Sequence, residues 1–187
     1  MESVVCAILF GSYARGEENE KSDVDVLVIT DRPIKIKRKG FDIVVIPKEK
    51  IESAKKINPI LFYSAVREGR AIINSSYLEE LKGQSVRKEL FEEFYKETLL
   101  GLKSDREIIE IDKELGNKET ANSVLYSSFL RLRGLFIINC IIKGINYSNS
   151  LFREWMIKNV KELDYDSFYS VYVSVREDSR TSSRLDI

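Results

Sequence analysis

The chain has 187 residues, of which 43% are apolar and 32% are charged, a balance typical of a soluble globular protein. Thirty basic and thirty acidic residues cancel, so no overall positive field indicates a nucleic-acid-binding protein. The chain contains no histidine, which excludes Ser-His-Asp triads and zinc sites built on imidazole.

Both cysteines, Cys6 and Cys140, lie within apolar runs and far apart in the sequence. They form neither a disulfide framework nor a paired-cysteine metal motif, so we expect buried free thiols in a cytoplasmic protein. The first residues lack the basic region of a signal peptide. The apolar run 124–142 carries Arg131 and Arg133 in its middle, which indicates a buried helix of a soluble protein and no membrane span.

The first part of the chain predicts short strands and helices. Apolar, β-branched runs predict strands at 3–10, 23–30, 41–47 and 70–74. Residues 13–20 indicate a helical turn or loop, 31–40 a basic connection, and 48–57 and 59–68 two helices.

From Ser85 onward the apolar spacing becomes helical. We expect helices at 85–115 with Ser85 as N-cap, at 117–143, at 150–160 with Ser150 as N-cap, and at 165–175, where a strand stays open. The sequence therefore predicts an α/β (α+β) domain with a small mixed sheet, residues 1–80, an all-α helical bundle, 81–176, and a polar tail, 177–187.

Three aspartates occupy strands that are otherwise apolar. Asp23 and Asp25 project from the same face of one strand, where two carboxylates repel each other unless a cation lies between them. Such a pair is suited to magnesium in phosphoryl or nucleotidyl transfer. If the 41–47 strand is a neighbour, Asp42 can face them, complete a two-metal site, and accept the proton of an attacking hydroxyl. We expect Mg²⁺, with Mn²⁺ as an alternative metal.

A Gly-Ser pair precedes these aspartates. Gly11 allows a sharp turn, and Ser12 with the following amides would begin a short helix that favours the phosphates of a nucleotide. Arg15 could contact phosphate, or could be a surface arginine paired with Glu17 or Glu18.

Each of these features has an ordinary structural explanation when it is taken alone. Asp-x-Asp is common on surface loops, and Gly-Ser is an ordinary turn. Their order along successive strands favours a catalytic site.

The segment "GSYARGEENEKSDVDVLV" resembles the signature of the minimal nucleotidyltransferases of the DNA polymerase β superfamily, which is Gly-Ser, ten residues, Asp-x-Asp. The resemblance, which covers about the first 75 residues, implies that Gly11 and Ser12 bind a nucleoside triphosphate and that Asp23, Asp25 and Asp42 bind magnesium. It implies transfer of a nucleoside monophosphate to a hydroxyl, with release of pyrophosphate.

The helical half is more distantly similar to the helical domain of kanamycin nucleotidyltransferase and to HEPN domains. HEPN ribonucleases have an arginine followed after four to six residues by histidine, whereas here Arg133 is followed by Asn139 and Cys140. We therefore do not expect RNA cleavage of that type.

The acceptor stays open at the level of sequence. ATP is the expected donor, and the hydroxyl could belong to a small molecule or a protein, with nucleic acid less favoured and no membrane partner expected. A homo-oligomer stays open. The rival hypothesis is an antitoxin-like regulatory module that adenylylates a partner or binds nucleotide without catalysis.

Three further groups of side chains have alternative explanations. The basic stretch 35–39 could meet a polyanion or the triphosphate, or form a solvated β-ribbon, which we favour. The tyrosines of the helical half could stack on a flat substrate or pack in the core. Arg131 and Arg133 would need partners if buried, and they could line a cleft facing the nucleotidyltransferase site or extend to the surface of the bundle.

Overall fold

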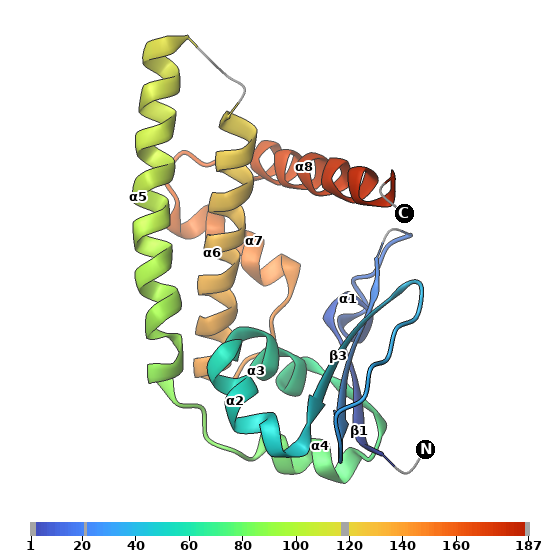
Figure 1. Ribbon diagram of the computed structural model, residues 1–187. Coiled ribbons are helices and arrows are strands. Elements are labelled where there is room, and N and C mark those ends of the chain that lie inside the picture. Colours follow the sequence, from blue (N-terminus) through green and yellow to red (C-terminus); the bar gives the residue numbers. More distant parts are fainter. Residues whose placement is uncertain (1–2, 21, 117–119, 186–187) are drawn as a thin grey trace. The chain divides into compact units, whose positions relative to one another are not determined.

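The computed structural model describes residues 3–20, 22–116 and 120–185, and its contacts divide the chain into two compact units (Figure 1). The first unit comprises Met1–Phe91 and Ile137–Asn149, and the second comprises Glu92–Phe136 and Ser150–Ile187. A small mixed sheet is followed by several helices, which confirms the predicted fold class.

The sheet of the first unit has four strands in the order β3-β2-β1-β4. Their bounds are Val4–Phe10 for β1, Val24–Thr30 for β2, Phe41–Pro47 for β3 and Arg70–Ile73 for β4. The pair β2·β3 is parallel, and the pairs β1·β2 and β1·β4 are antiparallel. All four strands agree with the sequence prediction to within one residue at each end.

The two inner strands supply most of the core of the sheet. Strand residues in register across a sheet point to the same face. Ile8 of β1 lies opposite Leu27 of β2, Cys6 lies opposite Ile29, and all four side chains are buried. Val26 and Val28, which point to the opposite face of β2, are buried as well, so this strand is covered on both faces.

Short helices accompany this sheet. They are α1 (Gly11–Arg15), the 3-10 helix η1 (Lys48–Lys50), α2 (Ile51–Ile57), α3 (Pro59–Glu68) and α4 (Ser75–Lys82). Helix α3 begins as predicted, with Pro59 in its first turn and the Asn58 side chain accepting a hydrogen bond from the Leu61 amide at 3.1 Å. In Figure 1, α2 and α3 lie beside the sheet.

Helix α4 was not predicted from the sequence. It begins after Asn74, whose side chain accepts the Tyr77 amide at 3.2 Å, and it buries Leu78 and Leu81. An asparagine cap followed by two leucines three residues apart is the signal that could have revealed it.

The remaining helices are η2 (Lys88–Phe91), α5 (Glu92–Leu115), α6 (Ala121–Lys143), α7 (Asn149–Asn159) and α8 (Tyr165–Leu185). The prediction that Ser85 caps a long helix is wrong, because Ser85 lies in a loop before η2 and the α-helix starts at Glu92. Ser150 is not a cap either, since α7 already includes Asn149. The predicted helix start at residue 117 falls outside the described residues.

Aromatic packing forms the core of the helical unit. The Phe129 ring contacts Phe152 edge-on at 5.4 Å and stacks on Tyr172 at 4.3 Å between centroids. Tyr126 also stacks on Tyr172, at 5.5 Å. These contacts favour core packing for the tyrosine-rich region.

The two arginines in the middle of α6 have partners within the helical unit, as predicted. Arg131 donates to Ser127 and pairs with buried Asp105 at 3.2 Å, and Arg133 lies 3.4 Å from the Tyr172 hydroxyl. Asp105 also accepts a hydrogen bond from Ser128 at 2.9 Å. These polar contacts tie α6 to α5 and α8.

Among the described helices, α6 alone is long and apolar enough to cross a membrane by length and composition. Core helices of globular proteins pass the same test. Here Phe129, Phe136 and Ile138 are buried within the protein. Only 33% of its apolar stretch is buried, and the two arginines with polar partners inside the helical unit are what favours a helix of a globular domain.

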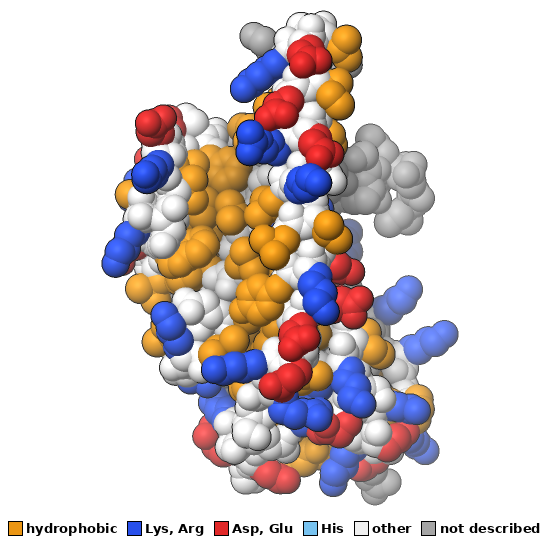
Figure 2. All heavy atoms as spheres, turned by 90° about the vertical axis from the view of Figure 1, so that its left-hand side faces the viewer, with side chains coloured by type: hydrophobic (Ala, Val, Ile, Leu, Met, Phe, Trp, Pro, Cys, Tyr) orange, Lys and Arg blue, Asp and Glu red, His pale blue; other side chains and the backbone are white. Residues whose placement is uncertain are grey.

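Apolar side chains remain exposed in the helical unit. On α5 they are Tyr95, Leu99, Leu100, Ile108, Ile111 and Leu115. Figure 2 shows hydrophobic side chains gathered on one face, with lysines, arginines and acids interspersed among them. The mixture of both signs of charge on this face offers no continuous basic track.

Candidate active site

The turn between β1 and α1 brings the backbone against a carboxylate. Gly11 follows β1 directly and has φ +69°, a conformation that favours glycine. A Cβ at this position would overlap the Asp25 Oδ2 atom. Glycine is therefore required twice, by the backbone conformation and by the closeness of Asp25.

Asp25 and Asp42 face the same side of the sheet. The parallel register of β2 and β3 pairs Asp25 with Asp42, and neighbouring strands lie about 4.8 Å apart. The condition that these strands be neighbours is thus met. On its other side Asp25 is in register with Phe10, the residue before Gly11. One row across the sheet therefore joins Asp42, Asp25 and the start of the Gly-Ser turn.

Asp23 lies just outside this row. Strand β2 starts at Val24, so Asp23 belongs to the preceding loop, which contains a turn in which Ser22 donates its amide to the Asn19 carbonyl at 2.9 Å. Within the described residues no three acidic or thiol side chains converge as a metal-binding group. The structure therefore brings together Asp25, Asp42 and Gly11, and leaves Asp23 as the neighbouring loop carboxylate.

Ser12 occupies the second position of α1 and is partly exposed. Its carbonyl accepts the amide of Glu17 at 3.0 Å and that of Gly16, which closes the short helix. Among the described residues the Ser12 hydroxyl makes no hydrogen bond, so it is available to a ligand beside Asp25.

Arg15 is held by two carboxylates. Its Nε donates to Glu17 at 2.8 Å and its Nη1 donates to Glu68 at 2.5 Å, while the guanidinium lies over the Tyr147 ring at 5.0 Å. Burial lowers the pKa of Arg15, but the two carboxylates outweigh it and the net pKa is raised. The pairing with Glu17 that the sequence left open is present. Glu68 was missed, because nothing in the sequence marks a partner so distant along the chain.

These contacts extend to the segment after α6. The Glu17 carboxylate also accepts the Asn149 amide at 2.8 Å, and the Tyr147 hydroxyl donates to the Asn149 side chain at the same distance. Arg15 thus ties α1 to α3 and to residues 147–149, all within the first unit. The geometry gives Arg15 a role in positioning α1, and its contact with phosphate stays a prediction.

The basic connection 31–40 is exposed except at Ile34 and Ile36, and it is not a strand. Its last residue, Gly40, accepts the Val24 amide at 3.2 Å, so the connection ends beside the first residue of β2. The exposure of Lys35, Lys37 and Lys39 agrees with the favoured prediction that this stretch is solvated, but the prediction that it forms a β-ribbon is wrong, because residues 31–40 contain no strand.

Comparison with known proteins agrees with this arrangement. The model of the family described as "Nucleotidyltransferase domain" matches residues 1–121, which is more than half of the chain. The chain belongs to this nucleotidyltransferase family. The matched range contains the whole Gly-Ser turn and all three aspartates, and it supports transferase activity.

A protein of Methanocaldococcus jannaschii is also similar to this nucleotidyltransferase. It is named "Putative protein adenylyltransferase MJ0141" and is 33% identical over 79 residues, which are 42% of this chain and 73% of the relative. More than half of the present chain lies outside this match. The similarity of the helical half to HEPN domains therefore stays a prediction.

Proposed function

We propose that the protein transfers AMP from ATP to a hydroxyl group of a protein, with release of pyrophosphate. The observation that carries the proposal is the in-register pair of Asp25 and Asp42. This pair lies beside Gly11, a position at which any Cβ would overlap the Asp25 carboxylate. Such a row presents hard oxygen donors next to a turn open to phosphate.

Magnesium fits these residues. Two aspartate carboxylates in register supply oxygen ligands, and the absence of a Cβ on Gly11 lets the Asp25 carboxylate lie directly against the Gly-Ser turn. Asp25 and Asp42 would hold the metal, with Asp23 added from the neighbouring loop. When bound, Mg²⁺ would neutralise phosphate charge and polarise the phosphorus–oxygen bonds. A second ion, or Mn²⁺, would use the same three carboxylates.

The chain's own residues would orient the reactants. Gly11 and Ser12 would hold the triphosphate, the Ser12 hydroxyl donating a hydrogen bond to a phosphate oxygen. The acceptor oxygen forms a bond to the α-phosphorus, the bond from that phosphorus to the bridging oxygen breaks, and pyrophosphate leaves. Asp42, the more exposed of the registered pair, would accept the proton of the acceptor hydroxyl.

The choice of donor and acceptor rests on the relative. Its printed name, a protein adenylyltransferase, favours AMP as the transferred group and a protein hydroxyl as the acceptor. A small-molecule hydroxyl is the second candidate, because a second compact unit follows the catalytic sheet and could select such a substrate.

Incubation of the protein with ATP labelled on the α-phosphate, magnesium and a lysate of the source cells tests this proposal. Label should pass to protein with the wild type and fail to pass with Asp25→Asn. The matched control is Asp31→Asn, which changes an exposed aspartate just beyond the other end of β2 and should leave transfer unchanged. Label moving only to small molecules would support the second candidate, and ATP binding without any transfer would support a regulatory module.

A further inference from the structure

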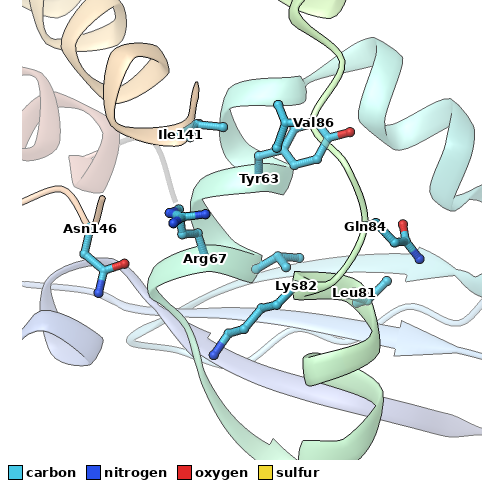
Figure 3. Close-up of a pocket in the computed structure, with 9 residues that line it drawn as sticks. Tyr63, Arg67, Leu81, Lys82, Gln84, Val86, Ile141 and Asn146 are labelled. Carbon is cyan, nitrogen blue, oxygen red and sulfur yellow. The ribbon is translucent and has the colours of Figure 1, made fainter. Parts of the chain in front are cut away.

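A pocket of about 270 Å³ lies within the first unit, and none of the three aspartates lines it (Figure 3). Its walls come from α3, from α4 and the loop after it, and from residues 141–146. The lining residues are Tyr63, Val66, Arg67, Leu81, Lys82, Gln84, Val86, Ile141 and Asn146. Apolar walls with a few convergent polar groups are typical of small-molecule sites.

Arg67 is the unusual member of this lining. It lies in the last turn of α3, and its Nε is buried without a hydrogen-bond partner in the described part of the chain. No carboxylate among the described residues pairs with its guanidinium, although the adjacent residue, Glu68, is paired with Arg15. A buried N–H group without a partner in the protein is rare in native proteins and calls for a specific explanation, such as a role in binding.

The guanidinium points from α3 into the space beside Ile141 and Asn146 (Figure 3). On that side the Arg67 guanidinium lies close to the backbone of Gly144, where an added Cβ would be 2.9 Å from Arg67 Nη2. A second cation, Lys82, lines the same pocket and pairs with Glu79 at 3.0 Å, on the exposed surface. The residues that line the pocket therefore include two cations and no carboxylate, and the carboxylate of Glu79, which pairs with Lys82, lies outside the lining.

We infer that this pocket binds the phosphate group of a small phosphate ester, with Arg67 as the main anchor. Guanidinium donors form a planar fork that matches phosphate oxygens, and Lys82 adds a second positive charge. The apolar side chains of Val66, Leu81 and Ile141 would pack on the uncharged part of the ester. The inference does not depend on the proposed AMP transfer, because no residue of the aspartate row lines the pocket.

A purely structural role for Arg67 is the alternative. The last turn of α6 ends at Lys143, and its carbonyl groups carry the negative end of the helix dipole, which a guanidinium stabilises. That role requires no ligand, and it predicts that Arg67 stabilises the fold without responding to phosphate.

The Nε–H signal of Arg67 distinguishes the two roles directly. In ¹H–¹⁵N spectra of the full chain, the cross-peak that disappears in Arg67→Lys belongs to Arg67. Titration with AMP, inorganic phosphate and adenosine, with EDTA present to remove divalent metals from the aspartates, should shift this peak saturably with AMP, more weakly with phosphate, and not with adenosine. The exposed Arg70 in β4 provides the internal control.

A variant that leaves Arg67 in place tests the charge requirement. Asn146 is exposed and lines the pocket, so Asn146→Asp should fold normally while adding a negative charge near the bound phosphate. We expect AMP binding at this site to weaken roughly fivefold in Asn146→Asp, and much less in Asn146→Ala. An Arg67 signal that does not respond to AMP or phosphate, or that responds equally to adenosine, would overturn the inference and support the structural role. Failure of AMP transfer would leave it untouched.

Discussion

The Cα of Gly11 and the carboxylate of Asp25 lie so close that any Cβ on residue 11 would overlap Asp25 Oδ2. This contact joins the end of β1 to the start of β2 at the point where Asp25 is in register with Asp42. The Gly-Ser turn and the two registered carboxylates, Asp25 and Asp42, are therefore one structural unit, and a change at either should disturb the other.

Replacing Gly11 by alanine should abolish transfer while leaving most of the stability. The Cβ would displace the Asp25 carboxylate, and a displacement of about 1 Å at a reacting centre can cost about 100-fold in rate. The positive φ adds about 1 kcal/mol of backbone strain. Transfer rates and thermal unfolding measure the two effects separately.

Gly16 is the matched control for this variant. It has φ +71°, and a Cβ there would meet nothing within 4 Å. Gly16→Ala should therefore lose a similar amount of stability and retain transfer. If both variants lost the same activity, backbone strain at α1 would explain the loss, and the overlap with Asp25 would not.

The sequence predicted the strands well because each combines β-branched residues with a turn signal. It also predicted the Gly-Ser turn and Asp25, because both are defined locally. It could not establish that β2 and β3 are parallel neighbours, since a connection as short as 31–40 more often joins antiparallel strands. The prediction that Asp42 faces the other aspartates therefore depended on the register of β2 and β3, which the sequence does not reveal.

Other features depended on contacts distant in sequence. The partner of Arg15 on α3 and the pocket around Arg67 have no local pattern, because both arise from the packing of separate segments. Ser85 was misread because serine before an apolar spacing resembles a cap, whereas a loop and a 3-10 turn precede α5 here.

Substitution of either registered aspartate should remove transfer without removing the fold. Asp25→Asn and Asp42→Asn each keep the size of the side chain and lose a metal-binding charge, so we expect at least a 100-fold lower rate, on the order of losses seen when a group that stabilises the transition state is removed. If Asp42→Asn retained its activity, the third carboxylate of the site would have to be a residue other than Asp42.

The ion pairs of Arg15 predict that substitutions of Arg15 and Glu68 have non-additive effects on stability. Arg15→Ala and Glu68→Gln remove opposite sides of the same buried pair, so their effects on stability should be far from additive, with a coupling energy of about 1 kcal/mol or more. Denaturant unfolding of the two single variants and the double variant measures this. A role in phosphate binding would appear separately, as a rise in KM for ATP in Arg15→Ala that Glu68→Gln does not share.

Asp105 should be the most sensitive polar residue of the helical unit. It accepts hydrogen bonds from Ser128 and Arg131 inside the bundle. Asp105→Asn should therefore lower the free energy of unfolding by about 2 kcal/mol. This is less than the full loss for a buried ion pair, because 30% of the Arg131 side chain is exposed. Asp166→Asn breaks an exposed pair with Arg153 and should have no measurable effect on thermal unfolding. Comparable losses in both variants would contradict this assignment.

The buried thiols should make the protein less stable at alkaline pH. Burial raises the pKa of Cys6 and of Cys140, so the unfolded chain releases these protons first as pH rises. This contribution to stability is complete below about pH 8.5, the ordinary thiol pKa, and is lost as pH rises toward the folded values. Thermal unfolding from pH 7 to 10 should show a decline that is smaller in Cys6→Ala/Cys140→Ala. Rapid reaction of either thiol with a thiol reagent in the native protein would contradict their burial.

The central claim is that Gly11, Asp25 and Asp42 form the catalytic centre of a nucleotidyltransferase. Its most direct test is release of pyrophosphate and transfer of label from α-labelled ATP, compared between wild type, Asp25→Asn and Asp31→Asn at saturating magnesium. We expect transfer by the wild type and by Asp31→Asn, and a rate at least about 100-fold lower in Asp25→Asn. Equal transfer by all three folded proteins would contradict it.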